Sequence, residues 1–149
     1  GTLYRPRIVK TIETSDGNIL KKIDPEIKGG LPASKETLQI VRNALFQVVQ
    51  GIHGTARRIR LKDVDIAGKT GTAQVFSIKQ GEEIKSEELE YSLRDHAWFV
   101  CYAPAKNPVI AISVMIEHGE HGSSAAAPIA GALIEQYTKK NKTKINRLL

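Results

Sequence analysis

The residues with the most chemical potential lie in one short stretch, residues 67–74, which reads Ala-Gly-Lys-Thr-Gly-Thr-Ala-Gln. It places a cation, Lys69, beside two hydroxyls, Thr70 and Thr72, with Gly71 between them. An ammonium group raises the local positive potential and can donate to a neighbouring hydroxyl, and a threonine hydroxyl can bind a carboxylate. Gly71 lets an extended peptide approach the backbone, and an N–H just beyond it can face a developing oxyanion. For the Lys-Thr-Gly run by itself a turn with a solvated lysine is the simpler interpretation, so the surrounding sequence has to decide whether these groups act on a substrate.

A phosphate-binding loop is the competing interpretation of the Gly-Lys-Thr run at residues 68–70. The P-loop motif requires a glycine five residues before its second glycine, and this sequence has Asp63 there, whose carboxylate repels phosphate. A P-loop lysine and threonine also open a helix, whereas Thr72, Val75 and Phe76 favour a strand. Composition and context therefore both argue against a phosphate site.

The sequence contains four histidines, which are possible metal ligands or catalytic groups. His118 and His121 have a spacing that a metal could use, but no further Cys or His lies near them, so both are expected to face solvent. His96 is expected to make a structural hydrogen bond, and His53 lies in a loop predicted to adjoin the Lys69 strand. No metal site and no cofactor is predicted.

Three short strands are predicted around the lysine motif. They cover residues 65–76, 97–103 and 109–116. The turn 104–108 joins the last two, which must pair antiparallel because a parallel return needs a long crossover. The third strand is almost continuously apolar, which predicts burial on both faces and a central position in the sheet.

Two helices are predicted to flank this sheet. The first begins after Ser34, an N-cap residue, carries apolar residues at helical spacing through Gln50, and ends at Gly51. The second begins near Pro128, which suits the first turn of a helix. Its inward face is expected to carry Ile129, Leu133 and Tyr137. Helices on both faces of an antiparallel sheet give a layered α+β domain.

The remaining segments are predicted to lie outside this core. Residues 4–14 and 19–23 form a hairpin around the turn signal Ser-Asp-Gly-Asn. Residues 29–32, with two glycines and a proline, form a linker. Residues 79–94 are strongly charged and are expected to form an exposed excursion.

The composition fits one domain, with 149 residues of which 41% are hydrophobic. Much of the net charge of +6 comes from residues 139–149, which are expected to form a solvated basic tail after a domain at 1–138. No basic stripe with interleaved aromatics is present, so no nucleic-acid partner is predicted. The single cysteine, Cys101, excludes an internal disulfide, and no apolar run reaches the roughly 20 residues that span a bilayer. A chain that begins with Gly1 is expected to be a piece of a longer protein.

The Lys-Thr-Gly run is also the signature of penicillin-recognising serine acyl-transferases, where it lies on a strand at the edge of the active site. Its surroundings closely resemble class B penicillin-binding proteins. The similar stretches are residues 1–9, 68–75, 95–104, 107–116 and 125–130, so the resemblance extends from the start of the chain to its last helix. Residues 94–97 and the charged excursion before them are most similar to the penicillin-binding protein 2 type, which serves cell elongation. The resemblance implies part of a serine β-lactamase/D,D-transpeptidase-like fold.

The resemblance implies a role for each residue of the motif. Family members cross-link peptidoglycan stem peptides through a serine acyl-enzyme, and β-lactams acylate the same serine. Carried over by position, Lys69 supports the serine of the family's middle motif electrostatically. Thr70 and Thr72 hold the carboxylate of the substrate or drug, the Thr72 N–H is an oxyanion donor, and Gly71 provides clearance.

The nucleophile itself is absent from this sequence. No serine has a lysine three residues later, and no Ser-x-Asn occurs, although both motifs precede this region in the family. We therefore expect the chain alone to be inactive and to need the N-terminal half of the domain. A non-catalytic scaffold or binding module that keeps the fold is the alternative, and a Ser-x-x-Lys motif upstream separates the two.

The resemblance also implies a cellular setting. The parent protein is expected on the periplasmic face of the bacterial cytoplasmic membrane, anchored through a segment outside this chain. Its expected partners are a glycan polymerase and cell-shape scaffold proteins.

Overall fold

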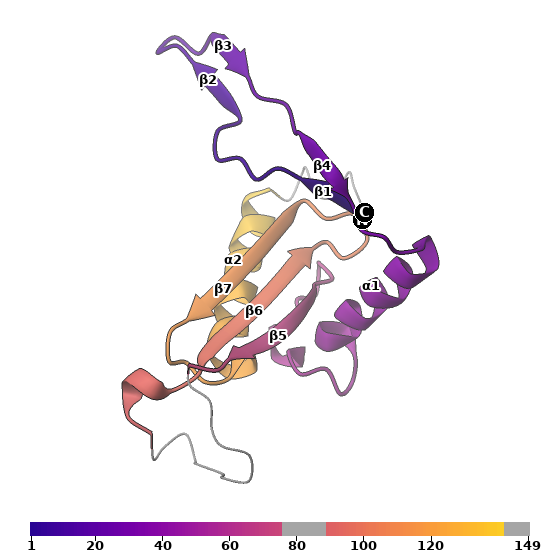
Figure 1. Ribbon diagram of the computed structural model, residues 1–149, viewed down its shortest axis with the longest axis vertical. Helices are drawn as coiled ribbons and strands as arrows, with labels where there is room; N and C mark the ends of the chain where they lie inside the picture. Colours follow the sequence, from indigo (N-terminus) through magenta and orange to yellow (C-terminus); the bar gives the residue numbers. More distant parts are fainter. Residues whose placement is uncertain (76–88, 142–149) are drawn as a thin grey trace. The chain divides into compact units, whose positions relative to one another are not determined.

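The structure of the chain, a computed structural model, describes residues 1–75 and 89–141 (Figure 1). It consists of two compact units, residues 1–40 and residues 41–149. The first ten residues of the predicted charged excursion, 79–88, and residues 142–149 of the predicted tail lie outside the described residues.

The first unit consists of two antiparallel strand pairs and the start of a helix. Strand β2 (Thr11–Glu13) pairs with β3 (Ile19–Lys22), which confirms the predicted hairpin. Strand β1 (Thr2–Tyr4) pairs with β4 (Ile27–Gly30). The predicted linker at 29–32 is therefore wrong for its first two residues, because pairing with β1 satisfies backbone groups that a linker leaves to water.

Helix α1 (Lys35–Gln50) has the predicted ends. The hydroxyl of Ser34 accepts the N–H of Thr37 at 3.2 Å, so Ser34 is the N-cap. At the other end the N–H of Gly51 donates to the carbonyl of Gln47 at 2.9 Å. A Cβ at Gly51 would lie 2.5 Å from that carbonyl oxygen, which explains why a glycine ends this helix.

The second unit is built on a three-stranded antiparallel sheet in the order β5-β6-β7. The strands are β5 (Ala67–Ala73), β6 (His96–Ala103) and β7 (Ile110–Ile116). Among the described residues β6 is the central strand and β7 an outer one, so the predicted central position of β7 is wrong here. Continuous apolarity predicts that a strand needs covering on both faces, but it does not say which neighbour supplies the cover.

Helix α2 (Ala127–Lys140) covers one face of this sheet (Figure 1). Pro128 lies in its first turn, as predicted. The predicted inward face is wrong for Ile129 and Leu133, which are 44% and 50% exposed, whereas Tyr137 is half-buried. The buried face carries three small residues, Ala127, Ala130 and Gly131, and one large one, Ile134. A Cβ at Gly131 would lie 2.9 Å from Cβ of Ile59, so the helix approaches too closely for a larger side chain at that position.

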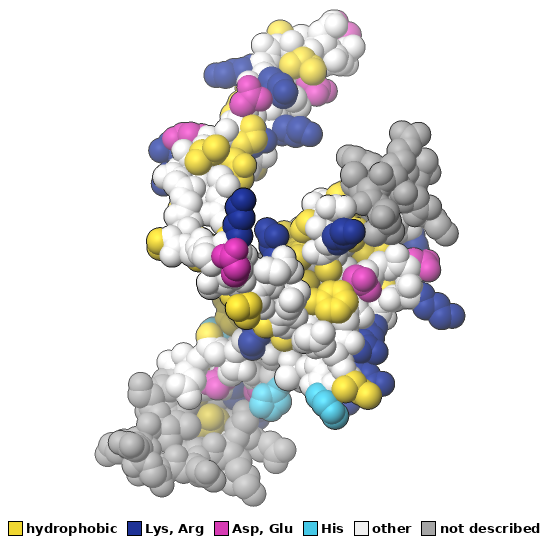
Figure 2. Space-filling view, turned by 90° about the vertical axis from the view of Figure 1, so that its right-hand side faces the viewer, with side chains coloured by type: hydrophobic (Ala, Val, Ile, Leu, Met, Phe, Trp, Pro, Cys, Tyr) yellow, Lys and Arg dark blue, Asp and Glu magenta, His cyan; other side chains and the backbone are white. Residues whose placement is uncertain are grey.

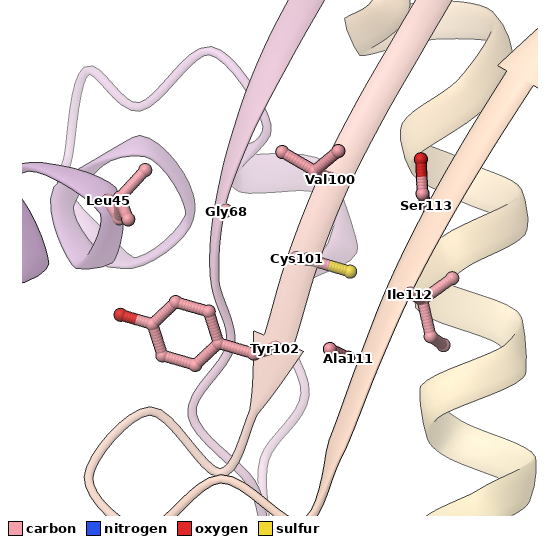
Figure 3. A pocket seen from close by; sticks show the side chains of 8 residues that line it. All are labelled: Leu45, Gly68, Val100, Cys101, Tyr102, Ala111, Ile112 and Ser113. Atoms are coloured by element: carbon pink, nitrogen blue, oxygen red, sulfur yellow. The ribbon is translucent and has the colours of Figure 1, made fainter. Parts of the chain in front are cut away.

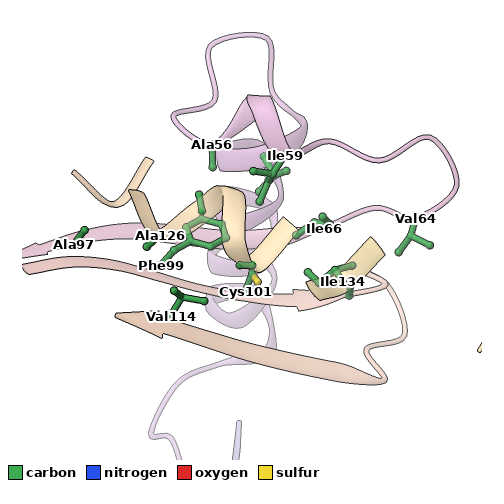
Figure 4. Close-up of a cluster of buried hydrophobic side chains, with 14 residues drawn as sticks. Ala56, Ile59, Val64, Ile66, Ala97, Phe99, Cys101, Val114, Ala126 and Ile134 are labelled. Atoms are coloured by element: carbon green, nitrogen blue, oxygen red, sulfur yellow. The ribbon is translucent and has the colours of Figure 1, made fainter. Parts of the chain in front are cut away.

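The core lies between α2, the sheet and the end of α1 (Figure 4). On β6 the buried residues Ala97, Phe99, Cys101 and Ala103 alternate with Trp98, Val100 and Tyr102, which face the other side of the sheet. The largest fully buried side chains are Phe99, Ile66, Ile134, Val49 and Pro104.

Burial raises the pKa of the Cys101 thiol from its ordinary value of 9.0 to about 11. The folded state therefore keeps a proton that the unfolded chain loses, so this group's contribution to stability is complete below pH 9.0 and is lost as the pH rises through about 11. At pH 8 we expect iodoacetamide to modify Cys101 at least about a hundredfold more slowly in the folded protein than in urea. Residue-resolved mass spectrometry measures both rates, and equal rates would contradict this burial.

Candidate active site

The lysine motif occupies β5, which pairs only with β6 among the described residues and leaves its other edge without a strand. Directly paired residues share a face of a sheet. Lys69 is opposite Val100 and Gly71 is opposite Trp98, so both lie on the face away from α2. Thr70 and Thr72 are opposite the buried Phe99 and Ala97, and so they lie on the α2 face. The side chain of Lys69 and those of the two threonines therefore leave the strand on opposite faces, beside its open edge.

The ammonium group of Lys69 is held close to its neighbour. Its Nζ donates to the backbone carbonyl of Thr70 at 2.6 Å and lies 3.5 Å from the Thr70 hydroxyl. The Thr70 hydroxyl is in turn 3.4 Å from the hydroxyl of Thr55. The loop that follows α1 thus adjoins β5, as predicted for the loop of His53, although His53 itself is exposed. Thr55 was not among the predicted site residues.

The Thr72 hydroxyl has a partner far along the chain. It donates to the backbone carbonyl of Glu120 at 3.2 Å. Glu120 belongs to the β7–α2 turn, residues 117–121, which connects β7 to the π-helical turn Gly122–Ala126 before α2. The side chain of Glu120 forms an ion pair with Arg94 at 3.2 Å. Sequence patterns missed this contact because it uses a backbone oxygen.

The histidines near this turn have structural partners. The N–H of His118 donates to Nδ1 of His96 at 3.0 Å, which confirms the structural hydrogen bond predicted for His96. Nδ1 of His118 is 3.0 Å from the carbonyl of Arg94, and its ring packs against those of His96 and Tyr91. The prediction that His118 faces solvent is wrong, whereas His121 is exposed as predicted. Residues 1–75 and 89–141 contain no group of three His, Cys, Asp or Glu side chains that could hold a metal ion.

A cavity of about 400 Å³ lies on the sheet face away from α2 (Figure 3). The side chains of Val100, Tyr102 and Ser113 project toward it from the sheet, and Leu45 lines it from α1. Its walls are mostly apolar, and no acid, base or cation lines it. The cavity therefore offers no charged group, whereas the residues predicted to act in catalysis lie on β5.

Comparison with known proteins identifies the fold. A model of the penicillin-binding protein transpeptidase domain matches residues 1–135. The solved structure of Pseudomonas aeruginosa PBP2 in complex with WCK 5153 is 36% identical, covers 91% of this chain and 27% of its own, and superimposes with a TM-score of 0.66. Penicillin-binding protein 2B of Streptococcus pneumoniae covers 94% of this chain and 22% of its own with a TM-score of 0.69, at 26% identity. These matches confirm the predicted α+β, transpeptidase-like fold.

The curated relatives agree with the structures. Peptidoglycan D,D-transpeptidase MrdA of Haemophilus influenzae is 33% identical over 99% of this chain, and MrdA of Acinetobacter baumannii is 45% identical over 68% of it. The chain spans only 23% and 15% of these two relatives. The resemblance to class B enzymes of the PBP2 type is thereby confirmed. The chain belongs to the family of penicillin-binding protein transpeptidase domains.

Proposed function

We propose that this chain is part of a peptidoglycan D,D-transpeptidase and supplies one wall of its active site. The observation that carries the proposal is the open edge of β5, which presents a cation, two hydroxyls and a glycine in a domain of this family. An open strand edge suits the antiparallel approach of an extended peptide, whose backbone groups can pair with those of the strand.

The proposed reaction proceeds through an acyl-enzyme. A serine from the part of the domain outside this chain attacks the carbonyl of the terminal D-Ala-D-Ala bond, and the terminal D-alanine leaves. The amine of a second stem peptide then attacks the ester and releases the serine. A β-lactam acylates the same serine, because its ring carbonyl takes the place of the peptide carbonyl.

Each motif residue has a part in this proposal. The ammonium of Lys69 supports the serine of the middle motif, and Thr70 and Thr72 bind the carboxylate of the substrate or drug. The N–H of Thr72 donates to the oxyanion that forms during the attack. Gly71 leaves room for the ligand, since a Cβ there would meet only Cβ of Trp98, at 3.3 Å.

The chain alone is proposed to be inactive. None of its serines has a lysine three residues later, so it lacks the nucleophile motif of the family. Its sheet also has uncovered apolar residues, with Val100 46% and Met115 42% exposed. The N-terminal half of the domain is the partner that we expect to cover this face and to pair with the outer edge of β7.

The cellular setting is proposed from the relatives. We expect the domain on the periplasmic face of the cytoplasmic membrane, held by an anchor outside this chain, and none of its described helices has the length and apolarity needed to cross a bilayer. A neighbouring structure contains Helicobacter pylori PBP2 in complex with MreC and is 29% identical over 81% of this chain. A scaffold protein of this kind and a glycan polymerase are the expected partners in cell elongation.

No nucleic-acid partner is proposed. On the side of the molecule seen in Figure 2, Lys and Arg side chains are interspersed with Asp and Glu, and the described residues in view form no continuous basic surface. Binding to nucleic acid depends on such a surface.

Intact-mass spectrometry under denaturing conditions tests the proposal. The full-length protein that contains this chain is expected to gain the mass of one penicillin, and the isolated chain is expected to gain none. An adduct on the isolated chain would contradict the assignment of the nucleophile to another segment. A full-length protein that binds no penicillin covalently would favour the alternative, a non-catalytic scaffold or binding module.

A further inference from the structure

The β7–α2 turn has an unusual backbone. His118 and Glu120 have φ angles of 56° and 61°, in the left-handed region that residues other than glycine rarely adopt. Such residues persist only where the surrounding contacts determine their conformation, and they gather at functional sites. The contacts of this turn therefore indicate which function its conformation supports.

The segment 94–96 holds the turn through backbone and side-chain contacts. The Glu120 N–H donates to the carbonyl of Asp95 at 2.8 Å, and the His118 N–H donates to His96 at 3.0 Å. The guanidinium of Arg94 is 3.2 Å from the carboxylate of Glu120, and these two side chains are only 30% and 26% exposed. An ion pair that is partly buried is less screened by water than an exposed one.

The turn directs one carbonyl at the lysine motif. The carbonyl of Glu120 accepts the Thr72 hydroxyl at 3.2 Å, across 48 positions of sequence. This is long for a bond between two oxygens, which is usually about 2.7–2.8 Å. A carboxylate is a stronger acceptor than a neutral carbonyl, so an incoming carboxylate can accept the Thr72 hydrogen bond in its place, because the hydroxyl rotates while its oxygen stays in position.

We propose that Glu120 and Arg94 are positioning residues for the Thr72 hydroxyl. Their ion pair fixes the β7–α2 turn, the turn fixes the Glu120 carbonyl, and this carbonyl holds the hydroxyl oriented until a ligand carboxylate replaces it. The inference rests on the proposed function, in which Thr72 binds that carboxylate. Neither residue touches the ligand, so their effect passes entirely through Thr72.

The test compares two drugs on the full-length protein, a penicillin with its free carboxylate and the methyl ester of the same penicillin. We expect Glu120→Gln and Arg94→Gln each to lower the second-order acylation rate with the free carboxylate about tenfold. The rate with the ester should change less than about twofold, because the ester offers no charged acceptor. Arg94→Lys keeps the charge and should retain most of the rate.

Two further variants make the result specific. In a Thr72→Val background Glu120→Gln should have no additional effect, because the hydroxyl that it positions is gone. Glu135→Gln is the matched control, since it removes an exposed ion pair with Lys139 on α2 and should change neither rate.

The outcomes separate this inference from the proposed function. Equal slowing of both drugs, or an effect of Glu120→Gln that persists in Thr72→Val, would overturn the positioning role and leave the transpeptidase proposal intact. A wild-type protein that neither drug acylates would overturn both. Thermal unfolding of every variant identifies any that fail to fold. If Glu120→Gln fails to fold, the comparison of Arg94→Lys with Arg94→Gln tests the positioning role instead.

Discussion

We expect Lys69→Ala to lower the rate at which a penicillin acylates the full-length protein by about a hundredfold or more. Lys69 is the only cation on β5, and its ammonium lies 2.6 Å from the Thr70 carbonyl at the open edge of the sheet. Removing one preorganised charged donor from an active site typically costs about 10² to 10³ in rate. A time course of labelling with a fluorescent penicillin measures the loss.

Stability should change little in this variant, because the side chain of Lys69 is exposed and makes no ion pair among the described residues. Lys106→Ala is the matched control, since it removes the same charge from the exposed turn between β6 and β7. Lys69→Arg keeps the charge but not the shape, and an intermediate rate is expected. Wild-type labelling by Lys69→Ala would exclude the proposed role of this lysine.

Local signals in the sequence predicted the local structure well. The capping residue Ser34 and the terminal Gly51 define α1, and the Ser-Asp-Gly-Asn turn gives the β2–β3 hairpin. The antiparallel pairing of β6 and β7 followed from the short turn between them. Each of these features depends on residues close together in the chain, whose preferences need no knowledge of distant partners.

Predictions that depended on distant partners were the ones that failed. Two large residues of α2, Ile129 and Leu133, were expected inside because of their type, but the helix packs through Ala127, Ala130, Gly131 and Ile134 instead. Close approach of a helix to its neighbours selects small residues, and apolar periodicity cannot distinguish this arrangement from burial of large ones. Among the described residues β7 is an outer strand rather than the expected central one, because the sequence of a strand does not identify the segments that pair with it.

The candidate site likewise has a part that local sequence predicts and a part that depends on distant residues. Its four motif residues could be identified from the sequence because a lysine, two threonines and a glycine have a recognisable order. The contacts around them come from Thr55 and from the carbonyl of Glu120, and a backbone carbonyl is present at every position. Only the fold reveals which carbonyl faces Thr72.

Gly122→Ala is expected to reduce both stability and acylation. An alanine Cβ at this position would lie 2.1 Å from the carbonyl oxygen of Trp98 and 2.7 Å from that of Gly71. Both neighbours are backbone atoms of β6 and β5, so neither can rotate away as a side chain can. Overpacking of this kind costs about 1–3 kcal/mol, and we expect a fall of at least about 4 °C in the midpoint of thermal unfolding.

The acylation rate should fall by more than this loss of stability explains, because the displaced backbone belongs to the motif itself. Gly71 faces the ligand in our proposal, and its backbone is also the surface on which Gly122 packs. Gly30→Ala is the matched control, since a Cβ there would meet only the carbonyl oxygen of Gly1 at an ordinary 3.5 Å. An unchanged unfolding midpoint and an unchanged labelling rate in Gly122→Ala would show that the two backbones separate without cost. A lower midpoint with normal labelling would show instead that β5 keeps its geometry without the close packing of Gly122, and this packing would then have no part in the site.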